Sequence, residues 1–103
     1  MYKISFYVPE SHLEPVKEVL FEAGAGSMGQ YDCCAWQSRG EGQFRALKGS
    51  HPFLGQLKQV ERVVEYKVEL VCDASHLTAA IQALKATHPY ETPAYDVIEV
   101  LDI

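Results

Sequence analysis

Residues 2–13, YKISFYVPESHL, recur 64 positions later as residues 66–77, YKVELVCDASHL. Continued without a gap for 35 pairs, this alignment holds eight identities, the last being Tyr31-Asp32 with Tyr95-Asp96. Each copy reads as an alternating apolar run, an amphipathic stretch and a second alternating run, which predicts a strand–helix–strand unit. Two such units in tandem predict an α+β fold, the ferredoxin-like split βαβ sandwich.

The first copy predicts a strand, a helix and a second strand. Residues 2–8 alternate, and the face expected under the helices carries Ile4, Phe6 and Val8. Ser11 and Glu14 have the spacing of a capping box, so the helix should begin at Ser11 as N-cap and end at Gly24-Ala25-Gly26. Residues 30–37 then read as the second strand.

The second copy predicts the same order. Its first strand starts near residue 62, and the residues expected to point inward are Val64, Tyr66, Val68 and Leu70. Its helix should begin at Ser75 as N-cap and end before Pro89, because the residue preceding a proline is driven out of helical geometry. A last strand follows over about 94–101. We therefore expect a single ferredoxin-like domain over 1–103, with repeat units at about 2–37 and 62–101.

The insertion at about 38–61 has no counterpart in the repeat and holds four glycines. We interpret it as an elaborated central hairpin, with an extra strand near 42–48 and a surface excursion around 50–55. In this topology the second and last strands lie at the sheet edges. The second strand, expected over 30–37, is too apolar for an open edge, so we expect a homo-oligomer.

Charge and composition exclude several classes of protein. Nine basic against fourteen acidic residues give a net charge of -5, the wrong sign for binding nucleic acid or an anionic membrane. No apolar run approaches the roughly 20 residues of a membrane span, and the N-terminus reads as a strand instead of a signal peptide, so we expect a cytoplasmic protein. The cysteines, Cys33, Cys34 and Cys72, form neither a disulfide framework nor a C-x-x-C motif, which favours buried thiols.

The segment His88-Pro89-Tyr90-Glu91 is the densest cluster of chemically active side chains. An imidazole and a carboxylate three residues apart can share a metal ion, so we expect a divalent cation at His88 and Glu91, with His51 of the insertion as a further ligand. The alternative is a structural turn in which His88 bonds carbonyls at the helix end. His12 and His76, at equivalent helix starts, are expected to be solvated.

A second expected site lies in the insertion. Gly40-Glu41-Gly42-Gln43-Phe44-Arg45 reads as a flexible segment whose backbone N–H groups and single cation could hold an anion. The expected ligand-binding residues are accordingly Tyr90, Gly40, Gly42 and Arg45. No nucleophile motif appears in the sequence.

These segments together resemble the inserted domain of the Nif-three-like (YqfO-type) dinuclear metal centre proteins. The resemblance is carried by Val8-Pro9-Glu10, Phe21-Glu22-Ala23-Gly24-Ala25-Gly26, Gly40-x-Gly42-x-Phe44-Arg45 and His88-Pro89-Tyr90-Glu91-x-Pro93. The last motif is also similar to the end of CutA. The resemblance implies a CutA/PII-like fold that trimerises and binds ligands or metals in clefts between subunits. It does not extend to the flanking halves that hold the two metals, so the hydrolase-like centre is not carried over.

Three functions are compatible with these observations. The first is a stand-alone oligomeric regulatory or binding module that takes a metal ion or small anionic ligand at intersubunit clefts. The second is a protein-interaction module without its own ligand, which docks a partner through the 38–61 loop. The third is a small metal-dependent hydrolase-like enzyme with a site built from His88, Tyr90 and Glu91. Metal-dependent stabilisation separates the first from the second, and turnover separates the third.

Overall fold

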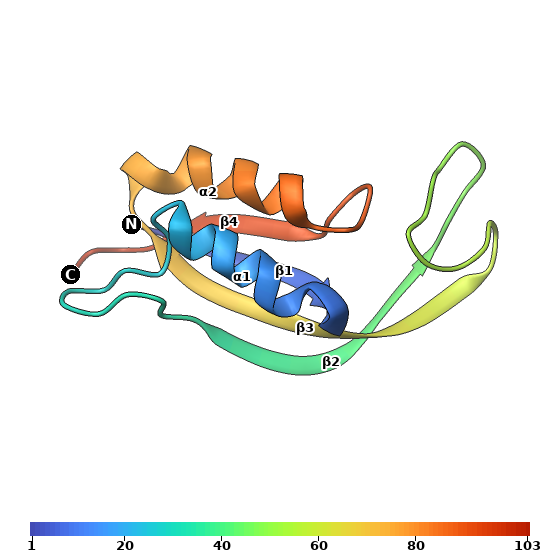
Figure 1. Cartoon of the computed structure of the whole chain (residues 1–103), viewed down its shortest axis with the longest axis horizontal. Helices are drawn as coiled ribbons and strands as arrows, with labels where there is room; N and C mark the ends of the chain where they lie inside the picture. The colour runs from blue at the N-terminus through green and yellow to red at the C-terminus, as the bar shows by residue number, and fades with distance from the viewer.

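A computed structural model describes residues 1–103 and contains one four-stranded antiparallel sheet with two helices over one face (Figure 1). In chain order the elements are β1 (Tyr2–Pro9), the short 3-10 helix η1 (Glu10–His12), α1 (Leu13–Glu22), β2 (Trp36–Arg45), β3 (Val60–Cys72), α2 (Ala74–Thr87) and β4 (Tyr95–Glu99). The strand order is β2-β3-β1-β4. The ferredoxin-like fold, with the second and last strands at the edges, is therefore confirmed.

The core lies between the two central strands and the helices. Ile4 pairs with Leu70 and Phe6 with Val68, so each of these residues pairs with the repeat equivalent of the other across the central ladder. Both helices bury apolar side chains against these strands, and the fully buried residues include Ile4, Phe6, Val8, Val16, Leu20, Val68, Ala80 and Leu84. The predicted inward faces of β1 and of the inner part of β3 are confirmed.

The second strand begins later than the repeat predicts. It spans Trp36–Arg45, so the prediction of a strand over 30–37 is wrong, and the extra strand expected near 42–48 is the end of β2. Positive φ angles at Gly29 and Cys33, of 58° and 54°, turn the chain here. An extended ladder cannot pass through such left-handed residues, and the stretch keeps only one isolated bridge, between Met28 and Tyr31.

Both predicted N-caps are also wrong. α1 follows a 3-10 turn and has no side-chain cap, because the Ser11 hydroxyl bonds the His12 ring at 2.8 Å instead. α2 is capped by Asp73, whose carboxylate accepts the His76 N–H at 3.0 Å. The predicted end of this helix is confirmed, since α2 stops at Thr87, ahead of Pro89.

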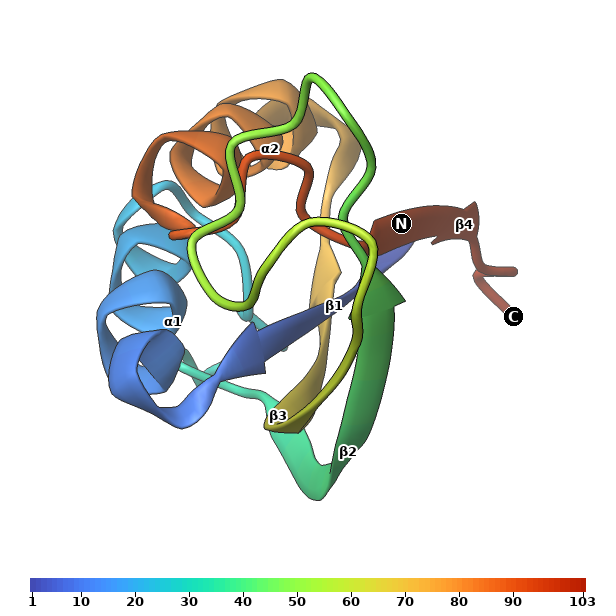
Figure 2. The same ribbon diagram turned by 90° about the vertical axis from the view of Figure 1, so that its right-hand side faces the viewer.

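β2 and β3 continue as a two-stranded ribbon beyond the helices, which makes the molecule elongated, 46 × 24 × 24 Å (Figure 1). Neither helix covers this outer part, so Val64, expected in the core, is 41% exposed. Residues 46–59 form the end of the ribbon, and Figure 2 shows them curling in front of the helix layer. Neither helix is long and apolar enough to cross a membrane.

Candidate functional site

A cavity of about 280 Å³ lies between the end of the ribbon and the turn that joins α2 to β4. The ribbon contributes aromatic and aliphatic side chains, and the turn contributes Tyr90, Glu91 and Thr92. The lining residues are Gln43, Phe44, Ala46, Ser50, Pro52, Phe53, Leu54, Glu65, Tyr90, Glu91, Thr92 and Ala94. Small-molecule sites have this character, an apolar hollow with few polar groups.

His88 is a buried structural residue in this arrangement. Its Nε2 donates to the Tyr7 carbonyl oxygen at 2.7 Å, and its Nδ1 accepts the Tyr90 N–H at 3.1 Å. These partners require the neutral ring with the proton on Nε2. Burial lowers the pKa of His88, and the Tyr7 carbonyl and the Glu65 carboxylate only partly oppose this. His88 thus ties the turn to β1 and fixes the position of Tyr90.

The lowered pKa of His88 predicts a loss of stability in acid. The unfolded chain binds this proton more readily than the folded chain does. The contribution of the neutral His88 ring to the free energy of unfolding should therefore be fully present above about pH 6.5 and be lost as the pH falls below it. His88→Gln can still donate to the Tyr7 carbonyl but does not titrate. Urea denaturation at pH 7.5 and 5.5 should give a smaller loss in the variant than in the wild type. Equal losses would contradict the assignment.

The Tyr90 hydroxyl is buried and has no hydrogen-bond partner. The Glu65 carboxylate lies near enough to the phenol to affect its pKa, but the two do not meet the geometry of a hydrogen bond. Burial first, and this carboxylate second, raise the pKa of Tyr90, so the phenol stays neutral. The rings of Phe44 and Phe53 each lie with their centroid 6.2 Å from that of Tyr90. The rings of Phe44 and Phe53 therefore lie beside a phenol whose hydroxyl lacks a hydrogen-bond partner within the chain.

Glu91 and His51 come together as predicted, but through a different atom of His51. The Glu91 carboxylate accepts the backbone N–H of His51 at 3.0 Å, so Glu91 holds the ribbon end against the turn. No three His, Cys, Asp or Glu side chains gather in a position to hold a metal ion. A divalent metal at His88, Glu91 and His51 stays a prediction, and binding through Nδ1 of His88 would require this atom to give up the Tyr90 N–H.

The expected anion-binding residues do not form one site. Gly40 and Gly42 lie within β2, paired with Glu65 and Val63, so this segment is a strand and not the flexible loop we predicted. A Cβ atom at Gly42 would collide with the Glu65 carboxylate, so this glycine makes room for Glu65. Both glycines line a small groove that shares only Glu65 with the aromatic cavity, and Arg45 lines neither.

Sequence reasoning missed Phe44, Phe53 and Glu65 as members of the site. Phe53 contacts the His12 ring edge-on at a centroid distance of 5.6 Å, which docks the ribbon end onto the start of α1. His12 is accordingly half-buried and not solvated as predicted. The one signal in the sequence was the presence of an aromatic residue, Phe53, inside a stretch otherwise typical of a surface turn.

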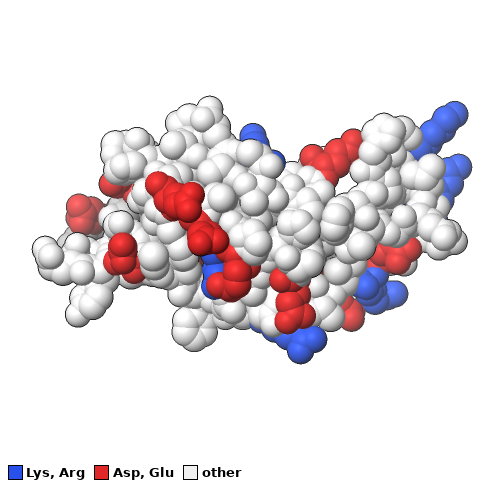
Figure 3. Space-filling model, in the orientation of Figure 1, with Lys and Arg blue, Asp and Glu red and all other residues white.

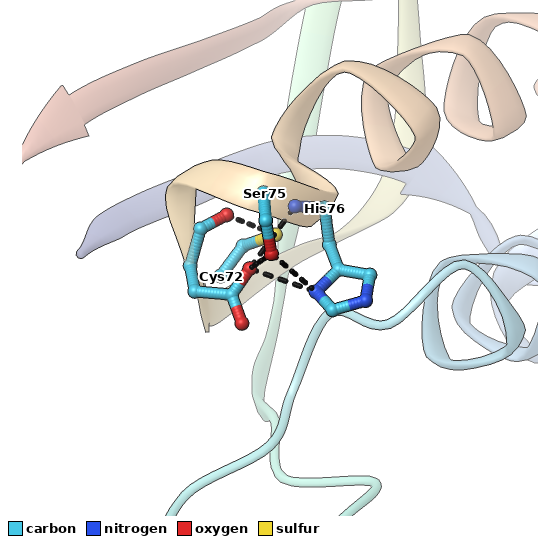
Figure 4. Close-up of polar contacts among 4 residues, drawn as sticks. Cys72, Ser75 and His76 are labelled. Atoms are coloured by element: carbon cyan, nitrogen blue, oxygen red, sulfur yellow. Dashed lines mark hydrogen bonds and ion pairs between the residues drawn. The ribbon is translucent and has the colours of Figure 1, made fainter.

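A second polar cluster lies at the start of α2 and is a helix cap (Figure 4). The Ser75 hydroxyl donates to the Asp73 carboxylate at 2.8 Å, and the His76 ring Nδ1 lies 2.7 Å from the same oxygen. Ser75 thus directs its proton to Asp73, so His76 does not activate it as a nucleophile. These hydrogen bonds, from Ser75 first and His76 second, lower the pKa of Asp73.

Asp73→Ala should destabilise the protein more than Ser75→Ala does. The aspartate accepts the backbone N–H of α2, whereas the serine supplies only a supporting side-chain bond. Because the folded-state pKa of Asp73 is lowered, its contribution should be present above about pH 3.8 and be lost at lower pH. Thermal unfolding of both variants at pH 7 tests the ranking, and the reverse order would restore Ser75 as the cap.

No known protein-family profile matches the chain. Among curated proteins, the GTP cyclohydrolase 1 type 2 homolog of Mycobacterium tuberculosis is 43% identical over 95 residues, 92% of this chain and 25% of the relative. The homolog of Staphylococcus aureus strain N315 is 39% identical over 99 residues, 96% of this chain and 27% of the relative. The chain spans about a quarter of the length of the curated relatives it matches.

Solved structures also include a larger protein of which this chain matches only one segment. A NIF3-related protein of Bacillus cereus superposes with a TM-score of 0.80 at 38% identity, covering 93% of this chain and 24% of the other. CutA1 of Pyrococcus horikoshii superposes with a TM-score of 0.68 at 22% identity, covering 100% of this chain and 86% of the other, which shows the fold alone. The expected resemblance to one segment of the NIF3-type proteins and the CutA/PII-like fold are confirmed.

Proposed function

We propose that this chain, a relative of one segment of the NIF3-type proteins with the fold of CutA, is a homo-oligomeric module that binds a small molecule. The fold and the relatives support the coarser assignment, a small regulatory or binding module. The finer assignment places the ligand in the cavity between the ribbon end and the turn at 88–93. It rests on one observation, the buried Tyr90 hydroxyl that has no partner in the chain.

An unpartnered buried hydroxyl costs stability, on the order of 1–3 kcal/mol. A chain that only needed a rigid turn would gain from phenylalanine at position 90, because the ring contacts with Phe44 and Phe53 would remain. A ligand that bonds the hydroxyl provides the missing partner. Tyr90 lines a cavity that has room for such a ligand, and the ligand would have to displace the side chains that cover the hydroxyl.

Native mass spectrometry of the untagged chain purified from cells tests this proposal. The expected result is a retained small molecule in the wild type that is lost in Phe53→Ala, which removes one wall of the cavity. Leu47→Ala, an exposed residue of the same segment that does not line the cavity, is the control. Apoprotein in all three cases would favour the alternative, a protein-interaction module that docks through the 38–61 loop.

Two features support self-association. β2 is an edge strand that begins with Trp36, 68% exposed, and Tyr31 in the preceding turn is 76% exposed. Charge also differs between two regions: Figure 3 shows a row of acidic side chains over α1, which carries Glu14, Glu18 and Glu22, and basic ones at the tip of the ribbon, whose end carries Arg45, Lys48 and Lys58, with further acidic side chains along the ribbon. A head-to-tail contact between these regions of successive subunits can close a ring.

Light scattering should therefore report a homo-oligomer, with a trimer as the expected state, at micromolar concentration. Trp36→Asp should shift the distribution towards smaller species, because a charge at the start of the edge strand opposes its burial. Gln37→Asp, which adds the same charge one residue along the strand on its opposite face, is the matched comparison. A wild-type monomer would contradict the oligomer.

A further inference from the structure

We infer that the ligand of the aromatic cavity is a small organic ammonium compound, an amine carried on an apolar or aromatic body. This inference rests on the proposed function, because it assumes that the cavity holds a ligand. It goes against the small anion expected from the sequence. The observations behind it are the charge of the lining, its aromatic rings and its size.

Every charged side chain that lines the cavity is acidic. Glu65 and Glu91 contribute carboxylates, and the lining contains no lysine, arginine or histidine. Glu65 forms no ion pair, and the Glu91 oxygen that does not face the His51 N–H is free to accept a further bond. An anion would meet two uncompensated negative charges here, whereas a cation would meet its complement.

Gly42 connects this charge to the fold. Because the Glu65 side chain lies in the space that a Cβ atom at position 42 would occupy, the glycine allows the carboxylate to reach the cavity. The same carboxylate influences Tyr90, whose ring centroid lies 6.2 Å from those of Phe44 and Phe53. The position of the Glu65 carboxylate, and through it the environment of the Tyr90 phenol, thus depends on the glycine at position 42.

The aromatic rings suit an ammonium group and the body that carries it. The face of an aromatic ring attracts a cation within about 6 Å of its centroid, and the cavity presents Phe44, Phe53 and Tyr90. The neutral Tyr90 hydroxyl can accept a hydrogen bond from an ammonium N–H. An amine therefore finds a hydrogen-bond acceptor, counter-charges and an apolar wall in one place.

The size limits the ligand. A cavity of about 280 Å³ lies just below the ~300–1,000 Å³ range of ligand pockets. A compound with one ring or a short alkyl chain fits this volume better than a nucleotide does.

Calorimetric titration with three compounds of matched shape tests the inference: phenethylammonium, the neutral 2-phenylethanol and the anion phenylacetate. We expect phenethylammonium to bind at least about tenfold more tightly than the alcohol, and phenylacetate to give no heat. Glu65→Gln and Glu91→Gln should each weaken phenethylammonium by about tenfold. The Glu91→Gln amide oxygen can still accept the His51 N–H, so this variant keeps the ribbon end in place.

Two further variants separate the local charge from the overall charge. Gly42→Ala pushes the Glu65 carboxylate aside and should weaken phenethylammonium as Glu65→Gln does. Glu99→Gln removes the same charge from the exposed end of β4, away from the cavity lining, and should leave affinity unchanged. The ammonium assignment would be overturned if phenylacetate bound as tightly as phenethylammonium. It would also be overturned if Glu65→Gln bound phenethylammonium as tightly as the wild type does. Binding of none of the three compounds would overturn it too, whereas the retained-ligand experiment decides the proposed function separately.

Discussion

Phe6→Ala is expected to lower the free energy of unfolding by about 3–5 kcal/mol. Phe6 is fully buried at the middle of β1, where it pairs with Val68 on one side and Tyr95 on the other. Both helices pack over this position, so truncation leaves a cavity that the sheet cannot collapse to fill. Urea denaturation at neutral pH gives the value directly.

Two substitutions in the same ladder serve as comparisons. Leu70 is the repeat equivalent of Phe6 and is also buried, so Leu70→Ala should cost about 2–5 kcal/mol. Tyr7 is half-buried and points to the opposite face of the sheet, so Tyr7→Ala should cost less. Equal losses for all three would mean that the second face is buried as deeply as the first, as a large intersubunit contact would make it.

Gly26→Ala is expected to cost about 2–5 kcal/mol, from roughly 1–2 for a left-handed backbone and roughly 1–3 for overpacking. Its φ is +80°, and a Cβ atom would lie 2.9 Å from the Cys34 carbonyl oxygen and from the Phe21 ring. The residue cannot shift away easily. Its N–H donates to the Val71 carbonyl at 2.8 Å, and its carbonyl accepts the Cys34 N–H at 2.8 Å.

Gly29→Ala is the matched control, because Gly29 also has a left-handed backbone but no atom lies within 4 Å of the position that its Cβ atom would take. Its cost should stay near the roughly 1–2 kcal/mol of the backbone alone. Thermal and urea unfolding of the two variants measure the difference, which isolates the close approach at Gly26. Indistinguishable values would show that the surrounding chain relaxes around the new side chain.

The internal repeat predicted the central part of the fold, because β1 and β3 are the most similar stretches and pair with each other. It failed where the copies diverged. Tyr31-Asp32 matches Tyr95-Asp96 in sequence, yet Tyr95 begins β4 whereas Tyr31 lies in a turn. Cys33 has a positive φ, but this could not be predicted from the sequence, because cysteine, unlike glycine, has no preference for the left-handed region.

The site was only half visible in the sequence for a similar reason. The turn at His88–Glu91 stands out by composition, but the roles of its members depend on contacts from distant segments. His88 is engaged by Tyr7, 81 residues away, and Glu91 by the backbone of His51. Phe53 joins Tyr90 only because the ribbon curls back at its end, and no periodicity encodes that curvature. Glu65 reaches the same cavity from β3, where it pairs with Gly40.

The most direct measurement of ligand binding is a crystal structure of the chain purified from cells without added ligand. We expect a homo-oligomer in which density for a small molecule fills the cavity and contacts the Tyr90 hydroxyl. A cavity filled instead by a side chain of a neighbouring subunit, with the Tyr90 hydroxyl bonded to it, would contradict the binding module and make this surface part of the subunit interface.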